Sequence, residues 1–405
     1  MGEEVIDKKE KEEILESVKL NETEEGKNIV ESEIVDLGVQ EDDTETEEDS
    51  DEAKSLYAEF SSFLEKKAEI TADSGIKDTI STGIDLVDAI LGGGFAIGAL
   101  NIVVGQPGSG KSMLASQALG QGQKQLKGNM LGAFLDSEEA TTLIRLANLG
   151  VKYPKIKPYS DITIEKVFKF IEGLCVFKQE KGIVDTPSIV VWDSIANTLS
   201  QAEIEADDVN QVIGRKARTL SLLIPKYVAK CAQHNICLIA VNQLRDVLSM
   251  GPFAAAKDLK FMSASKDMPG GTILKYNAFH LIEMKVKTSI APGATEDSAK
   301  YGFEGVIVKL KCVKNKLFPP NIEIEVVGSF MTGFSNFWTN FNFLKNTKRM
   351  NTGAWNYLVS LPNKKFRTKD APDLYKTDKE FREAFNASAK EAIKTEIIDK
   401  YSPEL

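Results

Sequence analysis

The segment from residue 105 to residue 112 is glycine-rich and ends in a lysine and a hydroxyl residue. It consists of Gly105, Gln106, Pro107, Gly108, Ser109, Gly110, Lys111 and Ser112, and it matches the pattern G-x-x-x-x-G-K-[ST] throughout. Glycines let backbone N–H groups turn inward around an anion, and the N-terminus of a following helix adds partial positive charge. An apolar run at 99–104 precedes the segment and a helix-compatible run at 113–119 follows it. The pattern predicts a nucleoside triphosphate site, in which Lys111 reaches the β- and γ-phosphates and Ser112 holds Mg²⁺.

Polar side chains follow three further apolar runs that are predicted to be strands. Asp136, Ser137, Glu138 and Glu139 follow the run 130–135, Asp193 follows 188–192, and Asn242 and Gln243 follow 236–241. Because ligands in open α/β sheets bind at the carboxyl ends of the strands, we expect these groups to converge on the nucleotide. There Asp193 orients Mg²⁺, directly or through water, and Gln243 senses the γ-phosphate with its amide. Glu138 orients or deprotonates the attacking water, with Asp136 and Glu139 as close competitors for that role.

The elements that must position these groups alternate between strand and helix up to about residue 330. Helical patterns at 163–178 and 214–233 separate continuous apolar runs, which is typical of a parallel sheet covered on both faces. Later runs at 279–286, 306–313 and 322–327 alternate more between apolar and polar residues, so we expect them to extend the sheet partly in antiparallel. The predicted fold class is α/β, with a mostly parallel central sheet, an N-terminal helix and a small α+β C-terminal domain.

Charge divides the chain near residue 54. Residues 1–54 hold 22 acidic and 6 basic side chains, and the remaining residues hold 38 and 44. We expect the acidic arm to be disordered, because it cannot bury enough apolar surface to fold. It is either a solubilising tail or an intramolecular decoy that competes with nucleic acid for the basic body. The predicted division is an arm at 1–54, a helix and linker at 55–78, a nucleotide-binding core at 79–330 and a C-terminal domain at 331–405.

The apolar positions of the helix at 55–78 need a surface to cover them, which is either their own domain or a neighbouring subunit. The four cysteines lie in apolar patterns without metal-ligand spacing, so we expect reduced core residues of a cytosolic protein. His234 and His280 have no partner cluster, which favours structural roles. No apolar run approaches the ~18 residues of a membrane span, and the N-terminus lacks a signal peptide. We therefore expect a cytoplasmic protein without a membrane partner.

Eight short motifs resemble, in order, those of the RecA-type homologous-recombination family. They lie at 80–83 with 88–93, 134–138, 190–194, 202–205, 241–245, 270–271 with 274–276, 313–316 with Pro319, and 353–355. The resemblance spans roughly residues 75–400, which makes it far more specific than a phosphate loop alone. It implies an ATPase with a RecA-like core that uses ATP and Mg²⁺ and assembles with copies of itself into a helical filament.

The resemblance also implies roles for individual residues. Glu138 matches the family's catalytic glutamate, Asp193 its Mg²⁺ strand and Gln243 its γ-phosphate switch. Lys314 and Lys316 match a lysine pair that reaches the ATP of a neighbouring subunit, where they stabilise charge on the γ-phosphate. Taken alone, these two residues could also be exposed strand-end lysines.

The segment 245–271 is long and rich in Ser, Ala, Met, Lys and Gly. Because it directly follows Gln243, ATP could order it and so switch DNA affinity. The resemblance places a DNA-binding loop here, with Arg245 at its start and Gly270 and Gly271 at its exit. Arg218 resembles an arginine that contacts the DNA backbone, although it could also belong to a solvated helix face. Phosphate contacts of this kind weaken with salt and read little sequence.

Some features depart from the bacterial pattern of the family. Arg145 stands where bacterial members have a tyrosine that stacks on adenine, and its guanidinium could take over that stacking. The acidic segment is N-terminal instead of C-terminal, and the DNA-binding loop at 245–271 is longer than in the bacterial pattern. The chain is therefore similar to a divergent, bacteriophage-type relative of the UvsX group. The basic region after residue 344 is either a site for duplex DNA or a solvated surface.

These observations together predict a DNA-dependent ATPase recombinase. We expect it to form filaments on single-stranded DNA and to exchange strands with homologous double-stranded DNA in recombination and repair. Single-strand-binding and loader proteins are further expected partners. We expect the protein itself in the cytoplasm, at the nucleoid, or in the cytoplasm of the host cell if the protein is viral. The alternatives are a hexameric replicative helicase with the same core and an accessory protein that binds ATP without hydrolysing it. The lysine pair and the motif at 202–205 favour the recombinase over the helicase, and Glu138 argues against the accessory protein.

Overall fold

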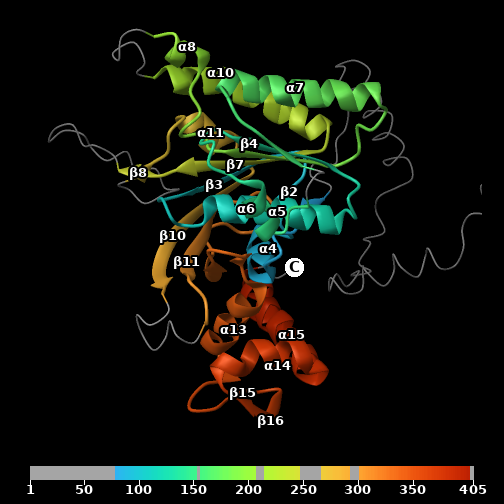
Figure 1. Cartoon of the computed structure of the whole chain (residues 1–405), viewed down its shortest axis with the longest axis vertical. Coiled ribbons are helices and arrows are strands. Elements are labelled where there is room, and N and C mark those ends of the chain that lie inside the picture. Colours follow the sequence, from blue (N-terminus) through green and yellow to red (C-terminus); the bar gives the residue numbers. More distant parts are fainter. Residues whose placement is uncertain (1–77, 153–155, 207–213, 247–265, 292–300, 402–405) are drawn as a thin grey trace, which may run out of the picture. The chain divides into compact units, whose positions relative to one another are not determined.

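A computed structural model describes residues 78–152, 156–206, 214–246, 266–291 and 301–401 (Figure 1). The predicted acidic arm at 1–54 and all but the last residue of the predicted helix and linker at 55–78 lie outside the described residues. The described residues belong to one compact unit, residues 75–405. The predicted boundary at residue 330 stays a prediction.

The predicted strands and helices appear in their predicted order, together with short elements that the sequence did not indicate. The strands are β1 (Thr79–Ile80), β2 (Phe95–Ala96), β3 (Leu100–Gly105), β4 (Leu131–Asp136), β5 (Lys157–Tyr159), β6 (Ser188–Asp193), β7 (Ile236–Gln243), β8 (Arg245–Asp246), β9 (Lys266–Asp267), β10 (His280–Ile290), β11 (Gly305–Lys314), β12 (Glu323–Ser329), β13 (Gly333–Phe334), β14 (Met350–Asn351), β15 (Asn356–Leu358) and β16 (Leu361–Phe366). The helices are α4 (Asp85–Leu91), α5 (Lys111–Gln125), α6 (Leu143–Asn148), α7 (Ile164–Glu180), α8 (Gln201–Ile204), α10 (Arg215–Gln233), α11 (Thr272–Asn277), α13 (Asn336–Asn346), α14 (Ala371–Thr377), α15 (Lys379–Ile393) and α16 (Asp399–Tyr401), with short helical turns at Thr368–Asp370 and Lys394–Ile398.

The described residues form a nine-stranded central sheet in the order β13-β12-β11-β10-β3-β7-β6-β4-β5. The strands from β10 to β5 in this order are parallel, and β11, β12 and β13 continue the sheet in antiparallel. This confirms the predicted mostly parallel α/β fold with an antiparallel extension. Because β3 lies among the parallel strands, the loop that follows it opens beside the ends of β7 and β10.

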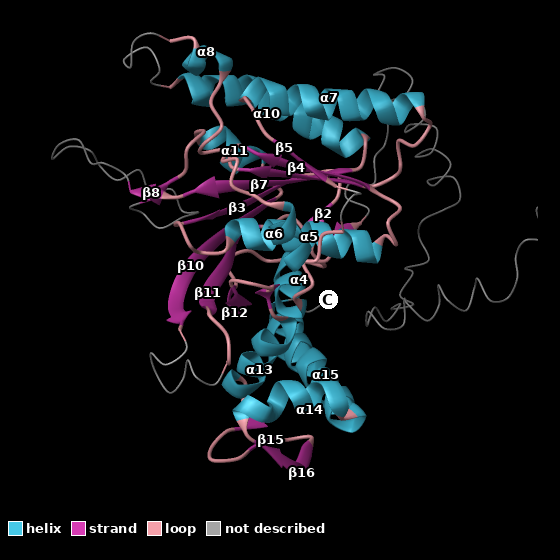
Figure 2. Cartoon of the chain, viewed as in Figure 1, coloured by secondary structure: helices cyan, strands magenta, loops and turns pink. Residues whose placement is uncertain are grey.

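Helices cover both faces of the sheet, as Figure 2 shows for α7 and α10 on one side and α4, α5 and α6 on the other. The strand β7 illustrates why. Cys237, Ile239 and Val241 pack into the hydrophobic cluster beneath α4 and α5, whereas Leu238 and Ala240 pack into the cluster beneath α7 and α10. Successive side chains of a strand point to opposite faces, so a strand that is apolar at every position requires a helix layer on each side.

A third hydrophobic cluster holds the C-terminal part together. The apolar positions predicted for the last long helix lie on α15, where Phe381, Phe385, Ala389 and Ala392 enter this cluster. Ile393 instead packs into the cluster of the sheet and α4. The helix begins where the side chain of Asp378 accepts a hydrogen bond from the N–H of Phe381, at 2.9 Å. The packing of Ile393 joins the C-terminal end of α15 to the core of the sheet.

The four cysteines, Cys175, Cys231, Cys237 and Cys312, are buried, which confirms them as core residues. Across the ranges that the structure describes, no helix combines the length and the apolar character that a membrane crossing requires.

Candidate nucleotide-binding site

The phosphate loop connects β3 to α5, as the sequence predicts. Gly108 and Gly110 have φ values of 75° and 84°, which favour glycine. A Cβ atom at Gly105 would lie 2.4 Å from the carbonyl oxygen of Met284, and one at Gly110 would lie 2.7 Å from the ring of Phe334. The glycines therefore allow the backbone to approach its neighbours and to turn tightly at the start of the helix.

The N-terminus of α5 presents free backbone amides to this loop. The first hydrogen bond of the helix runs from the N–H of Leu114 to the carbonyl of Gly110, at 2.9 Å. The amides of the first helical turn precede that bond and have no partner within the helix. Such amides, together with the helix dipole, form an anion site. The loop is thus shaped to receive phosphate oxygens.

Lys111 is buried, and its Nζ donates a hydrogen bond to the carbonyl of Gln106 at 2.9 Å. Burial lowers the pKa of Lys111, and the nearby carboxylates of Asp193 and Glu138 act in the opposite direction. The ammonium group therefore already lies inside the loop, held by one backbone oxygen of that loop. A phosphate group could replace this carbonyl as its partner.

Ser112 and Asp193 form the metal side of the site. Their side chains are hydrogen-bonded, and burial nevertheless raises the pKa of Asp193 to about 6. Among the described residues, no group of three or more His, Cys, Asp or Glu side chains could hold a metal ion. Mg²⁺ usually takes only one or two carboxylates, and phosphates and water complete its shell. A hydroxyl and one buried carboxylate beside the phosphate loop fit that donor set.

The carboxylate of Glu138 faces the end of β6. Its Oε1 accepts hydrogen bonds from Asn197 Nδ2 at 2.5 Å and from Ser194 Oγ at 3.2 Å. The competitor Asp136 is committed elsewhere, because its two oxygens accept backbone N–H groups of Glu138 at 3.0 Å and of Thr141 at 2.8 Å. The other competitor, Glu139, accepts the N–H of Asp161 at 3.2 Å. The role of Glu138 toward a water molecule stays a prediction. Sequence reasoning missed Asn197, which carries no motif of its own.

Gln243 lies directly beside the phosphate loop. It is the register partner of Gly105 on the neighbouring parallel strand, as predicted from the strand ends. The preceding residue, Asn242, is fully buried, and its Nδ2 donates to the carbonyl of Pro269 at 2.8 Å. Since Pro269 precedes the two glycines at the exit of the predicted DNA-binding loop, the end of β7 contacts both regions. The sequence did not single out Asn242 for this role.

The predicted loop at 245–271 differs from a wholly unstructured insertion. Its two ends pair as β8 and β9, with Arg245 opposite Asp267 in antiparallel. Gly270 and Gly271 have φ values of 102° and 79° and lead into α11. A Cβ atom at Gly270 would also lie 2.6 Å from the end of the Leu274 side chain, so the positive φ and this close approach together favour glycine at the exit. Residues 247–265 lie outside the described residues.

The predicted lysine pair lies far from the phosphate loop of its own chain. Lys314 ends β11 and pairs with Leu281, which in turn pairs with Ile102 of β3. Gly105 is three residues further along β3, about 10 Å at the rise of an extended strand. After Lys314 the chain continues away from the nucleotide edge, toward the opposite edge of the sheet. The role of Lys314 and Lys316 in catalysis, on the ATP of a neighbouring copy, stays a prediction.

Lys314 also contacts the helix that follows the predicted DNA-binding loop. Its Nζ donates hydrogen bonds to the carbonyls of Lys275 at 2.9 Å and of Tyr276 at 2.6 Å, at the end of α11. Burial and the neighbouring Lys316 lower the pKa of Lys314. Lys316 itself is exposed, with its Nζ 5.7 Å from the centre of the Phe279 ring.

Arg218 is exposed on α10, whereas the two basic residues before it contact backbone carbonyls. Arg215 donates to the carbonyl of Ala202 at 2.6 Å, and Lys216 donates to that of Ala196 at 2.7 Å. These two bonds attach the start of α10 to the segment around α8. Arg218 is therefore the member of this group that the structure presents to solvent, and its DNA contact stays a prediction.

Arg145 lies on α6, and its guanidinium reaches across to the turn between β12 and β13. It donates to the carbonyl of Phe330 and, at 3.4 Å, to that of Met331. Both of these residues are exposed. The predicted stacking of Arg145 on a nucleotide base stays a prediction, and Phe330 and Met331 are neighbours of that position that the sequence did not indicate.

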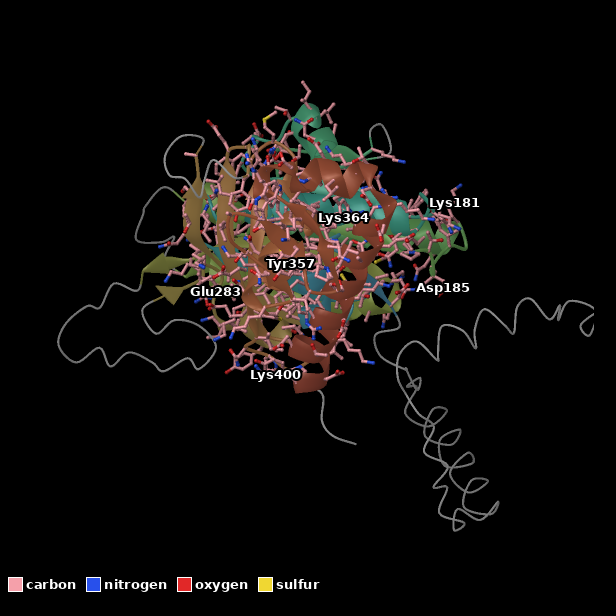
Figure 3. All side chains as sticks on the ribbon, turned by 90° about the horizontal axis from the view of Figure 1, so that it is seen from below. Lys181, Asp185, Glu283, Tyr357, Lys364 and Lys400 are labelled. Carbon is pink, nitrogen blue, oxygen red and sulfur yellow. The ribbon has the colours of Figure 1, made fainter. Side chains whose placement is uncertain are left out.

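The basic region after residue 344 is partly neutralised by its own helices. Lys364, labelled in Figure 3, lies 2.6 Å from the carboxylate of Asp378 and 2.7 Å from that of Glu380. The guanidinium of Arg367 lies 5.1 Å from the centre of the Trp355 ring. A site for duplex DNA in this region stays a prediction.

Comparisons with known proteins agree with this geometry. The family model described as the RecA N-terminal domain matches residues 66–335, which is more than half of the chain. Among curated relatives, Protein RecA of Thermus aquaticus is 30% identical over 250 residues, 62% of this chain and 66% of that protein. Protein RecA of Desulforapulum autotrophicum is 31% identical over 247 residues (61% and 63%), and that of Borrelia hermsii is 28% identical over 273 residues (67% and 69%).

The matched stretch thus covers slightly less than two thirds of the first two relatives. The matched residues include the phosphate loop and all four strand ends that gather around it. On the strength of the family match and of this arrangement, the chain belongs to the RecA family.

Proposed function

We propose that this chain is a DNA-dependent ATPase that assembles on single-stranded DNA and exchanges that strand with a homologous duplex. The observation that carries the proposal is the placement of Gln243. It lies in register with Gly105 of the phosphate loop, and its neighbour Asn242 is bonded to Pro269 at the exit of the predicted DNA-binding loop. A change at the γ-phosphate can therefore alter the loop through a few bonded residues.

Different residues of the chain have different roles in the proposed hydrolysis of ATP. The amides of the phosphate loop and Lys111 would bind the phosphates of ATP. Ser112 and Asp193 would hold Mg²⁺, which would supply neutralising charge for the transferred phosphoryl group. Glu138 orients the attacking water and accepts its proton. Asn197 and Ser194 donate hydrogen bonds to Oε1 of the Glu138 carboxylate and so restrain its orientation.

The lysine pair completes the site in trans. Lys314 and Lys316 lie on the edge of the sheet opposite the phosphate loop, so each copy supplies them to the ATP of a neighbour. Positive charge placed near the γ-phosphate stabilises the charge that develops in the transition state. Hydrolysis then requires assembly, and a head-to-tail interface of this kind generates an open filament or a ring.

We assign DNA binding to Arg218, Arg245, Gly270 and Gly271. We assign the binding of duplex DNA to the C-terminal part, residues 331–405. Strand exchange between a labelled single strand and a homologous duplex, with ATP and with a non-hydrolysable analogue, tests the proposal. We expect exchange with both nucleotides and ATP hydrolysis that rises with single-stranded DNA. Electron microscopy of the ATP- and DNA-bound protein should show open filaments. Closed rings would favour a helicase, and the absence of DNA-stimulated hydrolysis would favour an accessory protein.

A further inference from the structure

Asn315 lies between the two lysines, on the turn that follows β11. Its side chain forms hydrogen bonds within the turn, to α4 and to the side chain of His280. Its Oδ1 accepts from the N–H groups of Leu317 at 2.8 Å and Phe318 at 3.1 Å, which closes the turn locally. Its Nδ2 donates to the carbonyl of Ile90 at 2.9 Å, a residue 225 positions earlier in the chain. This one side chain therefore both shapes the turn and fastens it to α4.

Asn315 contacts α4 at the C-terminal end of that helix. The last carbonyls of a helix lack partners within the helix, so other groups must satisfy them. Asn315 takes the carbonyl of Ile90, and Nε2 of the buried His280 lies 3.1 Å from the carbonyl of Leu91. Gly92 follows with a φ of 77°, and a Cβ atom there would lie 2.8 Å from Cβ of Leu317. The turn is thus packed directly against the cap of α4.

The two lysine side chains contact groups other than α4. Lys314 rests on the carbonyls at the end of α11, and Lys316 lies over the ring of Phe279. Both ammonium groups end long flexible side chains that carry considerable rotamer entropy. How often they reach a phosphate therefore depends on the position of the backbone from which they extend. The pairing of Lys314 with Leu281 holds this backbone at one end, and Asn315 holds the turn that follows.

We propose that Asn315 is the positioning residue of the lysine pair: by fastening the turn at 314–318 to the end of α4, it directs both lysines toward ATP bound by a neighbouring copy. The proposal rests on the proposed function, because it requires that the lysines act in trans. It adds that the carboxamide between them is needed for catalysis but not for ATP binding.

The first test compares Asn315→Ala and Asn315→Asp with Asn342→Ala, a control that loses a side-chain contact to Tyr301 far from the turn. We expect kcat of DNA-stimulated hydrolysis to fall about 10- to 100-fold in both Asn315 variants, the size of effect that a small misplacement causes. The KM for ATP should stay within about twofold of wild type, because the proposed ATP contacts of each chain come from its own phosphate loop. Asp keeps the two acceptor bonds but presents an oxygen to the carbonyl of Ile90, so the link to α4 is lost. It also adds a negative charge beside the two lysines and His280, and Asn315→Ala, which adds no charge, separates the two effects. An Asn315→Asp variant with wild-type kcat would overturn the proposal.

The second test is subunit mixing. Lys111→Ala copies have a disabled phosphate loop and an intact lysine turn, whereas Asn315→Ala copies have the reverse. In an equimolar random mixture, about a quarter of the head-to-tail interfaces pair an intact loop with an intact turn, so the mixture should hydrolyse ATP faster than either variant alone. If Asn315→Ala binds ATP and melts like the control but the mixture hydrolyses ATP no faster than Asn315→Ala alone, the proposal is wrong.

The failure of this inference can be told from failure of the proposed function. If the wild-type protein showed no DNA-stimulated ATP hydrolysis, both the proposed function and the role of Asn315 would be wrong. Normal hydrolysis by Asn315→Ala, together with loss of hydrolysis in the double variant of Lys314 and Lys316, would leave the proposed function standing and remove the role of Asn315.

Discussion

Leu244 donates its backbone N–H to the carbonyl oxygen of Gly105, 3.1 Å away. The residue after the predicted γ-phosphate sensor is thus bonded to the first residue of the phosphate loop. Together with the bond from Asn242 to Pro269, this makes three consecutive residues a bridge between the nucleotide and the exit of the predicted DNA-binding loop. Backbone and buried side-chain bonds of this kind have few alternative arrangements, which suits a two-state switch.

The bridge predicts the behaviour of Gln243→Ala. The variant should bind ATP with an affinity within about twofold of wild type, since the phosphate loop is intact. It should lose the ATP-dependent gain in affinity for single-stranded DNA, a coupling that typically amounts to 5- to 150-fold. Fluorescence anisotropy of a labelled oligonucleotide, with and without ATP, measures this gain. Gln233→Ala, at the exposed end of α10, is the matched control. A full ATP effect in Gln243→Ala would exclude the sensor role.

The lysine pair gives a second prediction. Replacing Lys314 and Lys316 together by Ala should reduce DNA-stimulated hydrolysis by about 1,000-fold, the lower range for removing a cationic finger from a phosphoryl-transfer site. ATP binding should persist, because the pair lies at the edge of the sheet away from its own phosphate loop. Lys311→Ala, on the same strand, should hydrolyse ATP like wild type. Normal turnover by the double variant would refute a role in trans.

The strand ends could be predicted from the sequence because they obey local rules. Each apolar run marks a buried strand, and a polar residue directly after it must lie at the carboxyl edge of the sheet. Asp193, Gln243 and Glu138 were found in this way, and the structure places each beside the phosphate loop. The continuous apolar character of β7 likewise indicated helices on both faces.

Contacts between distant parts of the chain could not be predicted in the same way. Asn315 reaches Ile90, and Arg145 reaches the carbonyl of Phe330. A side chain that binds a remote backbone carbonyl leaves no periodic pattern, since one donor at the correct position suffices. The pairing of β8 with β9 was missed for a related reason, because a two-residue ladder is too short to alternate.

The buried carboxylate of Asp193 makes the affinity for Mg²⁺ and ATP depend on pH. Burial raises the pKa of Asp193 to about 6, and Mg²⁺ requires the ionised form. Protonation competes with the metal below that pH, so the dissociation constant of Mg·ATP should rise about tenfold for each pH unit below 6 and stay constant above it. Calorimetric titrations between pH 5 and pH 8 measure it. Asp193→Asn should bind weakly without this dependence, and an unchanged wild-type affinity at pH 5 would contradict the assignment.

Asp88 gives a prediction about stability instead of activity. It lies on α4 and accepts hydrogen bonds from the hydroxyl of Ser81 at 2.5 Å and from the N–H and hydroxyl of Thr82 at 2.8 and 2.7 Å. Burial raises its pKa from 3.8 to about 6 in spite of these bonds. The folded protein therefore binds this proton more tightly than the unfolded chain does. The contribution of Asp88 to the free energy of unfolding is fully present below pH 4 and is lost as the pH rises through 6.

Asp88→Asn removes this ionisation while keeping the hydrogen bonds, because its carbonyl can accept from Thr82 and its NH₂ can donate to Ser81. The variant should be more stable than wild type by up to about 3 kcal/mol above pH 6, the equivalent of two pKa units, and equally stable near pH 4. Urea unfolding across this range measures the difference. Asp373→Asn, at an exposed position of α14, controls for the change in net charge. Because the ionisation of Asp193 is common to both proteins, it cancels in this difference. A gain that does not vary with pH would show that Asp88 is already neutral, or equally ionised, in the folded and unfolded states.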